Sequence, residues 1–368
     1  MKKTNLKTNH LLLFITLSLL AYGLIVLYSA STVQSFNNFG NTTYYILHQT
    51  LYGGVIGLIA LYVCSKTDYH IWQKYLPVLI FASLFLLLLV KIPSLGGLNL
   101  GGASRWVNFG PLTFQPAELA KLAVIAYIAS WVDKKRARLN EFYFGLLPSL
   151  IIIALFAGLI LWQPDFGTML VLLLVAFFML VAAGINWKYF FYAAIGGALS
   201  LYLFIKFEPY RARRLVTFFN PALDPKGISY QINQALLAIG SGGLWGFGYG
   251  LSRQKHNYLP ASINDSIFAV LAEELGFFRV LLALALFAAF ALKGFQIAKN
   301  APDIFGKLLG FGIVCWITLQ ALINIAAIIN LLPLTGIPLP FFSYGSTALI
   351  FNLAAVGILL NISRYNKA

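Results

Sequence analysis

The chain has 368 residues, of which 60% are hydrophobic and only 10% are charged. A typical soluble domain is about 45–50% apolar and about 25% charged, so this chain has too few charges to cover a water-exposed surface. The composition therefore excludes soluble folds and disordered chains, and it predicts an integral membrane protein. A β-barrel is also excluded, because the apolar stretches are continuous and do not alternate with polar residues.

The formal net charge is +15 at pH 7. In a soluble protein this charge would favour a nucleic acid as partner, but here the basic residues stand between apolar runs. That pattern is typical of topology control and of contact with anionic lipid, so we expect the membrane and no nucleic acid as a partner. The two cysteines, Cys64 and Cys315, predict neither a disulfide framework nor a metal site.

Ten apolar runs are candidates for transmembrane helices, at roughly 20 residues per crossing. They cover residues 10–31, 45–64, 75–92, 116–132, 142–162, 167–185, 188–206, 267–292, 307–330 and 347–362. We interpret the first run as a retained helix, because it is longer than the apolar core of a signal peptide and more spans follow. The prediction is an all-α polytopic membrane protein with about ten transmembrane helices, forming one domain over residues 1–368.

Basic residues gather at both chain ends and in alternate loops, most densely at residues 134–138. By the positive-inside rule these segments are cytoplasmic, which predicts that both termini are cytoplasmic. Two segments on the other side are too long to be simple connectors, namely residues 93–115 and an extracytoplasmic loop at about 207–266 between the seventh and eighth helices. The second segment interleaves arginines and lysines with aromatic residues, which favours a binding surface over a plain linker.

Asp265 is the strongest candidate for chemistry, since it lies where the long loop enters the eighth helix and is soon followed by the apolar pair Ile267 and Phe268. Two interpretations are open. Asp265 is either a helix N-cap or a carboxylate that removes a proton from a hydroxyl or holds a divalent cation. Arg253 and Lys255, close by in the sequence, would supply cations for phosphate oxygens.

Two further acidic residues invite both a structural and a functional reading. Glu118 and Lys121 stand three residues apart on one helix face and are expected to pair. The pair either fixes helix packing or presents Lys121 to a substrate phosphate. Asp165 lies in a turn between two helices, where it either caps the second helix or contacts a pocket.

Glu273 and Glu274 are adjacent and therefore point about 100° apart on a helix. At most one of them is expected to face the same cavity as Asp265. Arg279 is expected to neutralise one of the two glutamates.

A series of different short motifs extends along nearly the whole chain. They are Arg105-Trp106, Gln115–Lys121, Pro164–Thr168, Asn220-Pro221, Asp224–Gly227, Tyr230-Gln231, Gln234, Ala238–Gly243, Gln254-Lys255, Tyr258–Pro260, Asp265–Val270, Glu273–Gly276, Gln320, Asn324, Leu332–Gly336 and Pro338–Gly345. Together they resemble the SEDS family (shape, elongation, division and sporulation). Residues 250–255 and 27–31 resemble the division members of that family more than the elongation members.

The resemblance implies a peptidoglycan glycosyltransferase that polymerises lipid II at the outer face of the bacterial cytoplasmic membrane, in cell division or in cell shape. It also implies that the carboxylate matching Asp265 is essential. The implied partners are lipid II, a class B penicillin-binding protein that crosslinks the glycan, and other divisome or elongation proteins. A division member would be located at the septum.

The implied reaction needs a base for the acceptor hydroxyl and positive charge for the departing diphosphate. We expect Asp265 to be the catalytic base. The expected substrate contacts are Arg105, Glu118, Lys121, Asp165, Arg211, Arg214, Gln234, Arg253, Lys255 and Ser343. A divalent cation, Mg²⁺ or Mn²⁺, bound at Asp265 is a further expectation, and no organic cofactor is expected.

Several positions depart from the family pattern. Ala261 stands where a glutamate is usual, Asn264 and Ser266 flank the aspartate in place of the commoner residues, and Arg279 and Ser346 stand where glycine is usual. The change at Ala261 argues against a mechanism that needs a second carboxylate there. Two other classes stay open, a lipid II flippase or transporter and a non-catalytic scaffold for the class B penicillin-binding protein.

Overall fold

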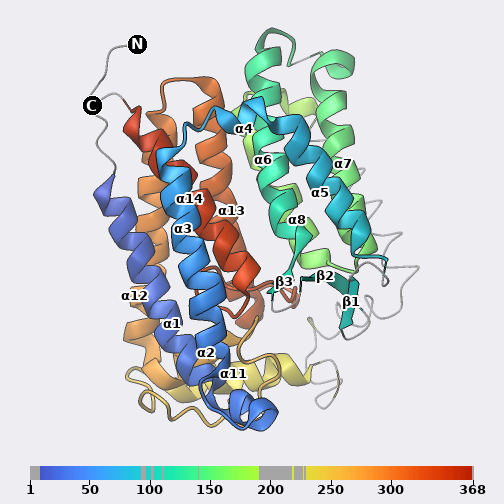
Figure 1. The fold of residues 1–368 in the computed structure, drawn as a ribbon. Helices are drawn as coiled ribbons and strands as arrows, with labels where there is room; N and C mark the ends of the chain where they lie inside the picture. The colour runs from blue at the N-terminus through green and yellow to red at the C-terminus, as the bar shows by residue number, and fades with distance from the viewer. Residues whose placement is uncertain are drawn as a thin grey trace.

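The computed structural model describes residues 9–92, 97–100, 103–109, 112–139, 141–189, 218, 227 and 229–366. Its elements are α1 (His10–Phe39), α2 (Tyr44–His48), η1 (Gln49–Val55), α3 (Ile56–Lys66), α4 (Ile71–Lys74), α5 (Leu76–Leu89), β1 (Gly97–Leu100), β2 (Ala103–Phe109), β3 (Leu112–Phe114), α6 (Pro116–Lys135), η3 (Arg136–Arg138), η4 (Phe142–Leu146), α7 (Leu147–Trp162), α8 (Phe166–Ala182), α11 (Tyr230–Gly242), α12 (Ile267–Lys299), α13 (Ile304–Ile328) and α14 (Ser346–Arg364). The long helices run side by side as a bundle (Figure 1).

Among the described residues, six helical segments are long and apolar enough to cross a membrane. They are His10–Phe39, Tyr44–Lys66, Phe142–Trp162, Ile267–Lys299, Ile304–Ile328 and Ser346–Arg364. Two shorter apolar helices, α5 and α8, and the charge-bearing α6 lie in the same bundle. The prediction of a helical, multi-pass fold is confirmed. The predicted span at 188–206 lies outside the described residues, apart from its first two positions.

The two ends of the bundle differ. The start of α1 and the end of α14 lie at one end, and α11 and the strands lie at the other (Figure 1). Hydrogen bonds join the elements of the first end, such as Asn9 N to Ser363 Oγ at 3.2 Å and Gln73 Nε2 to Asp133 Oδ2 at 3.0 Å. The basic segment that follows α6 is at this end as well. The described lysines in the last turns of α3, α6 and α12 thus gather at one end of the bundle.

Residues 93–115, predicted as a loop, contain a small antiparallel sheet in the order β1-β2-β3. Val107 of β2 faces Gly97 of β1 on one side and Phe114 of β3 on the other. Strands of three to seven residues between glycines carry too little periodicity to be predicted from the sequence. The sheet lies at the start of α6, at the same end of the bundle as α11.

The eighth predicted helix, 267–292, extends to Lys299 and is broken at Gly276. Gly276 has φ +75° and ψ 179°, a conformation that favours glycine, and a Cβ there would lie 2.3 Å from Gly246 N. The loop after α11 takes over hydrogen bonds that the helix loses. Phe247 N donates to Glu273 O at 3.0 Å, and Phe277 N donates to Gly243 O at 2.9 Å. This pairing satisfies backbone groups that would be costly to leave open in a membrane protein.

Candidate active site

Asp265 lies two residues before α12 begins, and its side chain is half-buried. Its Oδ2 accepts a hydrogen bond from Nε2 of Gln231, on α11, at 3.1 Å. The same amide nitrogen lies 3.0 Å from Ser266 Oγ. Ser266 occupies the N-cap position of α12, so the interpretation of Asp265 as the N-cap is wrong. The carboxylate is therefore oriented by Gln231 of α11 and does not cap the start of α12.

The backbone around Asp265 is held from two directions. Asn324 of α13 donates through Nδ2 to Asp265 O at 2.9 Å and to Ile337 O at 2.8 Å. Ser343 donates through Oγ to Asn264 O at 2.5 Å and accepts from Leu339 N at 2.8 Å. Two consecutive carbonyls are therefore fixed, one by an amide and one by a hydroxyl. Such support restricts where the carboxylate can point.

Glu118 and Lys121 form the predicted ion pair on α6, with Nζ 2.9 Å from Glu118 Oε1. Both side chains are buried, and Nζ also donates to Gln320 Oε1 of α13 at 2.8 Å. The ammonium lies 4.6 Å from the centre of the Trp316 ring, close enough for a cation–π contact. The pair is thus part of a polar network between α6 and α13.

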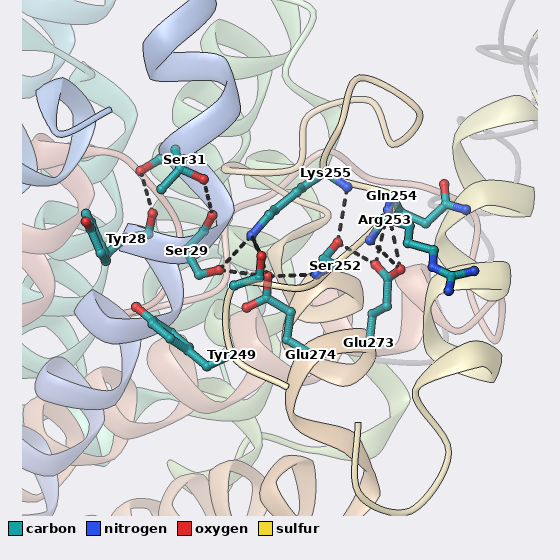
Figure 2. A network of polar contacts seen from close by, with 12 residues as sticks. Tyr28, Ser29, Ser31, Tyr249, Ser252, Arg253, Gln254, Lys255, Glu273 and Glu274 are labelled. Atoms are coloured by element: carbon teal, nitrogen blue, oxygen red, sulfur yellow. Dashed lines mark hydrogen bonds and ion pairs between the residues drawn. The ribbon is translucent and has the colours of Figure 1, made fainter. Parts of the chain in front are cut away.

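Lys255 pairs with Glu274, and Figure 2 shows the network around them. Its Nζ lies 2.8 Å from Glu274 Oε1, 3.0 Å from Ser29 Oγ and 2.7 Å from Gly250 O. Lys255 is 5% exposed, so its ammonium faces the protein in this structure. Its predicted contact with substrate remains untested.

Glu273 holds the loop that carries Lys255. Its Oε1 accepts from Arg253 N at 2.9 Å, and its Oε2 accepts from Ser252 Oγ at 2.5 Å. Ser252 N in turn donates to Glu274 Oε1 at 3.2 Å. The two adjacent glutamates both bind one turn of the loop (Figure 2), although they point in different directions on the helix.

Arg279 does not neutralise either glutamate, contrary to our expectation. Its Nη1 donates to Trp245 O at 2.9 Å and to Leu275 O at 3.1 Å. The break at Gly276 places these carbonyls within reach, and the loop lysine takes the role predicted for the arginine. In the same loop, Tyr249 donates through its hydroxyl to Ile25 O at 2.8 Å, and burial, helped by the charge of Glu274, raises the pKa of Tyr249.

Arg105 and Asp165 both hold the turn between α7 and α8, each through partners of its own. The guanidinium of Arg105 donates to the carbonyls of Gln163, at 3.3 Å, and Pro164. Asp165 caps α8, since its Oδ1 accepts from Thr168 N at 3.1 Å. The capping interpretation of Asp165 is therefore confirmed, and its contact with a pocket stays a prediction.

The remaining predicted contacts are less constrained. Gln234 is half-buried and lies one turn after Gln231 on the same face of α11. Arg253 is exposed, with its guanidinium carbon 5.1 Å from the centre of the Phe247 ring. Arg211 and Arg214 lie outside the described residues.

In the part of the chain that the structure describes, no three His, Cys, Asp or Glu side chains come together as a metal site. The amide of Gln231 donates to the carboxylate of Asp265, and the same amide nitrogen bonds to Ser266 Oγ. Hard divalent cations prefer several carboxylate and carbonyl oxygens, and an amide nitrogen donor is not such a ligand. Mg²⁺ or Mn²⁺ at Asp265 stays a prediction, and no step below depends on it.

Sequence reasoning assigned no role to the residues that orient Asp265. Gln231 and Asn324 both stand in the quoted motifs, but a lone amide side chain in or beside an apolar run does not reveal its partners. The signal that was available is their polarity at positions that are otherwise apolar, because buried amides must find hydrogen bonds.

Known proteins resemble this chain over almost all of its length. A family model described as "Cell cycle protein", covering FtsW, RodA and SpoVE, matches residues 9–368. Stage V sporulation protein E of Bacillus subtilis (strain 168) is 40% identical over 357 residues, which are 97% of each chain. The probable peptidoglycan glycosyltransferase FtsW of Geobacter sp. (strain M18) is 38% identical over 353 residues, 96% of each chain.

Solved structures share the fold as well. A chain from a study entitled "Structural coordination of polymerization and crosslinking by a peptidoglycan synthase complex" has a TM-score of 0.80 and 26% identity, covering 98% of this chain and 99% of its own. The rod shape determining protein RodA of Thermus thermophilus has a TM-score of 0.72 and 25% identity, covering 98% of both chains. The protein described here belongs to the FtsW, RodA and SpoVE family of membrane proteins, the SEDS family.

Proposed function

We propose that this chain is a peptidoglycan glycosyltransferase that polymerises lipid II at the outer face of the bacterial cytoplasmic membrane. Relatives that are 38% identical over nearly the full chain are named probable peptidoglycan glycosyltransferases. The observation that carries the proposal is the half-buried carboxylate of Asp265, oriented by Gln231 and supported through its backbone by Asn324.

The proposed topology has about ten spans, cytoplasmic termini and an outer loop at about 207–266. The charge distribution supports it, because the lysine-rich segments lie at the end of the bundle that holds both termini. Asp265 contacts α11, which lies at the other end. The carboxylate would then face the periplasmic side, where the glycan is assembled.

The reaction proposed for Asp265 is a single displacement. The carboxylate removes the proton from the 4-hydroxyl of the acceptor sugar while that oxygen attacks C1 of the donor. The bond from C1 to the diphosphate oxygen breaks, and undecaprenyl diphosphate leaves with its electron pair. One displacement inverts an α-linked donor to a β-linked product, so no covalent enzyme intermediate is needed.

Positive charge must stabilise the departing diphosphate. Arg253 is the described side chain best suited to this task, because it is exposed on a loop turn that Glu273 holds through the backbone. Arg211 and Arg214 are proposed to contribute from the outer loop.

A class B penicillin-binding protein is the proposed partner, and a place at the division septum is the proposed location. The structural relative from a peptidoglycan synthase complex supports such a partner. The resemblance of residues 250–255 to division members supports the septum.

The test uses purified protein in liposomes, with and without the partner, and lipid II as substrate. Asp265→Asn should lower glycan synthesis by about 10²- to 10⁴-fold, the usual contribution of a general base. Asp68→Asn is the matched control, because Asp68 is exposed and contacts His70 at the end of the bundle with the termini. Substantial polymer from the Asp265→Asn protein would refute the assignment.

The same preparation separates the two other classes. A flippase would move labelled lipid II across the bilayer without polymerising it. The unmodified protein would then make no glycan that Asp265→Asn could lower. A scaffold would do neither, and polymer would form only when a different glycosyltransferase is added.

A further inference from the structure

One face of α13 carries three polar side chains at intervals of four residues, Trp316, Gln320 and Asn324. This spacing places them in a row along the helix. All three are nearly inaccessible, with 0%, 1% and 1% of their surfaces exposed. A buried row of this kind must be satisfied by specific partners, and those partners reveal what it connects.

The orientation of the Gln320 amide is fixed by its neighbours. Its Oε1 accepts from Lys121 Nζ at 2.8 Å and from Trp316 Nε1 at 3.0 Å. Both of these groups are donors only, so they must face the oxygen. The amide nitrogen therefore points the other way, and it donates to Pro338 O at 3.0 Å.

Asn324, one turn further along, continues the row. It donates to Ile337 O at 2.8 Å and to Asp265 O at 2.9 Å. The consecutive carbonyls of Ile337 and Pro338 are thus both held by α13. A hydrogen-bonded path leads from Lys121 through Gln320, the Ile337–Pro338 backbone and Asn324 to Asp265.

The Lys121 ammonium is committed to this path. It has three N–H donors, and its neighbours are Glu118 Oε1, Gln320 Oε1 and the face of the Trp316 ring. Only 3% of the residue is exposed. A substrate phosphate would have to displace one of these buried partners.

We propose that Lys121 and Gln320 are positioning residues, which act on the reaction through the Ile337–Pro338 segment and Asn324 by setting the place of Asp265. This inference rests on the proposed function, and it assigns Lys121 a role other than the phosphate contact expected from the sequence. Misplacement of Asp265 would reduce stabilisation of the transition state. Binding of lipid II would stay unchanged, because on this proposal Lys121 and Gln320 do not touch the substrate.

The test is a double-mutant cycle in glycan synthesis with Lys121→Met, Gln320→Leu and both together. Each single change should lower kcat about 10- to 100-fold, as expected when a catalytic group is displaced by about 1 Å, with KM unchanged. The kcat of the double variant should lie within about twofold of the kcat of the less active single variant, since both changes break one path.

Direct contact between Lys121 and a phosphate predicts a different pattern. Lys121→Met would then raise KM, and its effect would multiply with that of Gln320→Leu in the double variant. Either result would overturn the inference, as would an unchanged kcat for Gln320→Leu.

Two further proteins keep the test decisive. Gln296→Leu is the matched control, because Gln296 also accepts from a lysine, Lys293, but is exposed near the end with the termini. If Gln320→Leu does not fold, Gln320→Glu replaces it, since it keeps the acceptor for Lys121 and removes the donor to Pro338. The same fall in kcat is then expected, and full activity would overturn the inference.

Asp265→Asn, assayed beside these variants, distinguishes the two levels of the argument. If Asp265→Asn is fully active, the proposed function fails. If Asp265→Asn is inactive while Gln320→Leu and Lys121→Met match the unmodified protein, only the positioning path fails.

Discussion

The described part of the chain contains two buried lysine–glutamate pairs that look alike and are built differently. Lys121 pairs with Glu118 at 2.9 Å, and Lys255 pairs with Glu274 at 2.8 Å, with all four side chains at most 3% exposed. The first pair lies within one turn of α6. The second joins a loop to a helix 19 residues further along the chain.

The pairs also differ in how far their oxygens are satisfied. Glu274 Oε1 accepts from Lys255, from Ser29 of α1 and from the backbone of Ser252. Glu118 Oε2 is buried and accepts no hydrogen bond from any residue that the structure describes. The difference indicates distinct roles, because a carboxylate oxygen with three donors fixes the structure around it, whereas a buried oxygen without a donor keeps a cost that a purely structural pair would avoid.

The largest effect should come from breaking the pair that ties the loop down. Lys255→Met leaves the Glu274 carboxylate buried without a counter-charge, and we expect a loss of about 3–5 kcal/mol in the free energy of unfolding. Thermal unfolding in detergent measures the loss, and limited proteolysis should show cleavage in the loop around Ser252. Lys299→Met, at an exposed lysine of α12, is the matched control.

The double variant Lys255→Met with Glu274→Gln separates charge from contact. It removes both charges and keeps an oxygen that can accept from Ser29 and Ser252, so most of the lost stability should return. If Lys255→Met instead raises KM for lipid II and leaves the unfolding temperature unchanged, the lysine serves the substrate and the comparison between the two pairs is wrong.

A smaller effect should follow from removing one hydroxyl of the same network. Ser29→Ala removes the hydroxyl that donates to Glu274 Oε1. The oxygen of this hydroxyl, Ser29 Oγ, also lies 3.0 Å from Lys255 Nζ. We expect a loss of about 1–3 kcal/mol, the usual cost of removing a hydrogen bond to a charged group. Ser31→Ala is a close control, because Ser31 is buried on the same helix but bonds only to Tyr28 O. Equal losses in the two proteins would show that the network around Glu274 adds no stability.

The contrast between the pairs also explains what the sequence could predict. The spacing of Glu118 and Lys121 on one helix face is local information, and it predicted their ion pair correctly. The apolar runs likewise predicted the described long helices, because each run reflects the thickness of the membrane. The Asp165 cap was predictable for the same reason, since cap and capped helix are adjacent in the chain.

The partners of Lys255 and Arg279 were not predictable, because tertiary structure decides them. Gly276 breaks α12, and the break brings the loop carbonyl of Trp245 to Arg279 while Lys255 takes Glu274. A helix read as continuous offers Arg279 only the glutamates one or two turns before it. The support of Asp265 by Asn324 depends on a contact between residues 59 positions apart, which no local pattern encodes.

The smallest effect should come from Arg279, which provides a second attachment for the loop. Its guanidinium donates to Trp245 O and Leu275 O but is exposed, so water can replace part of each bond. Arg279→Leu should cost about 0.5–1.5 kcal/mol. It should also speed hydrogen exchange at Phe277, whose N–H bonds to Gly243 O across the break.

Lys293→Leu, at a half-buried position on the same helix whose ammonium bonds to Gln296 Oε1, should leave that exchange unchanged. If Arg279→Leu lowers the free energy of unfolding as much as Lys255→Met does, the loop depends on the exposed Arg279 as much as on the buried Lys255–Glu274 pair. Burial would then not make the Lys255–Glu274 pair more important than the exposed Arg279, and the three donors to Glu274 Oε1 would not explain the stability of the loop. The expected ranking, Lys255 above Ser29 above Arg279, follows from the decreasing cost of leaving each partner unpaired.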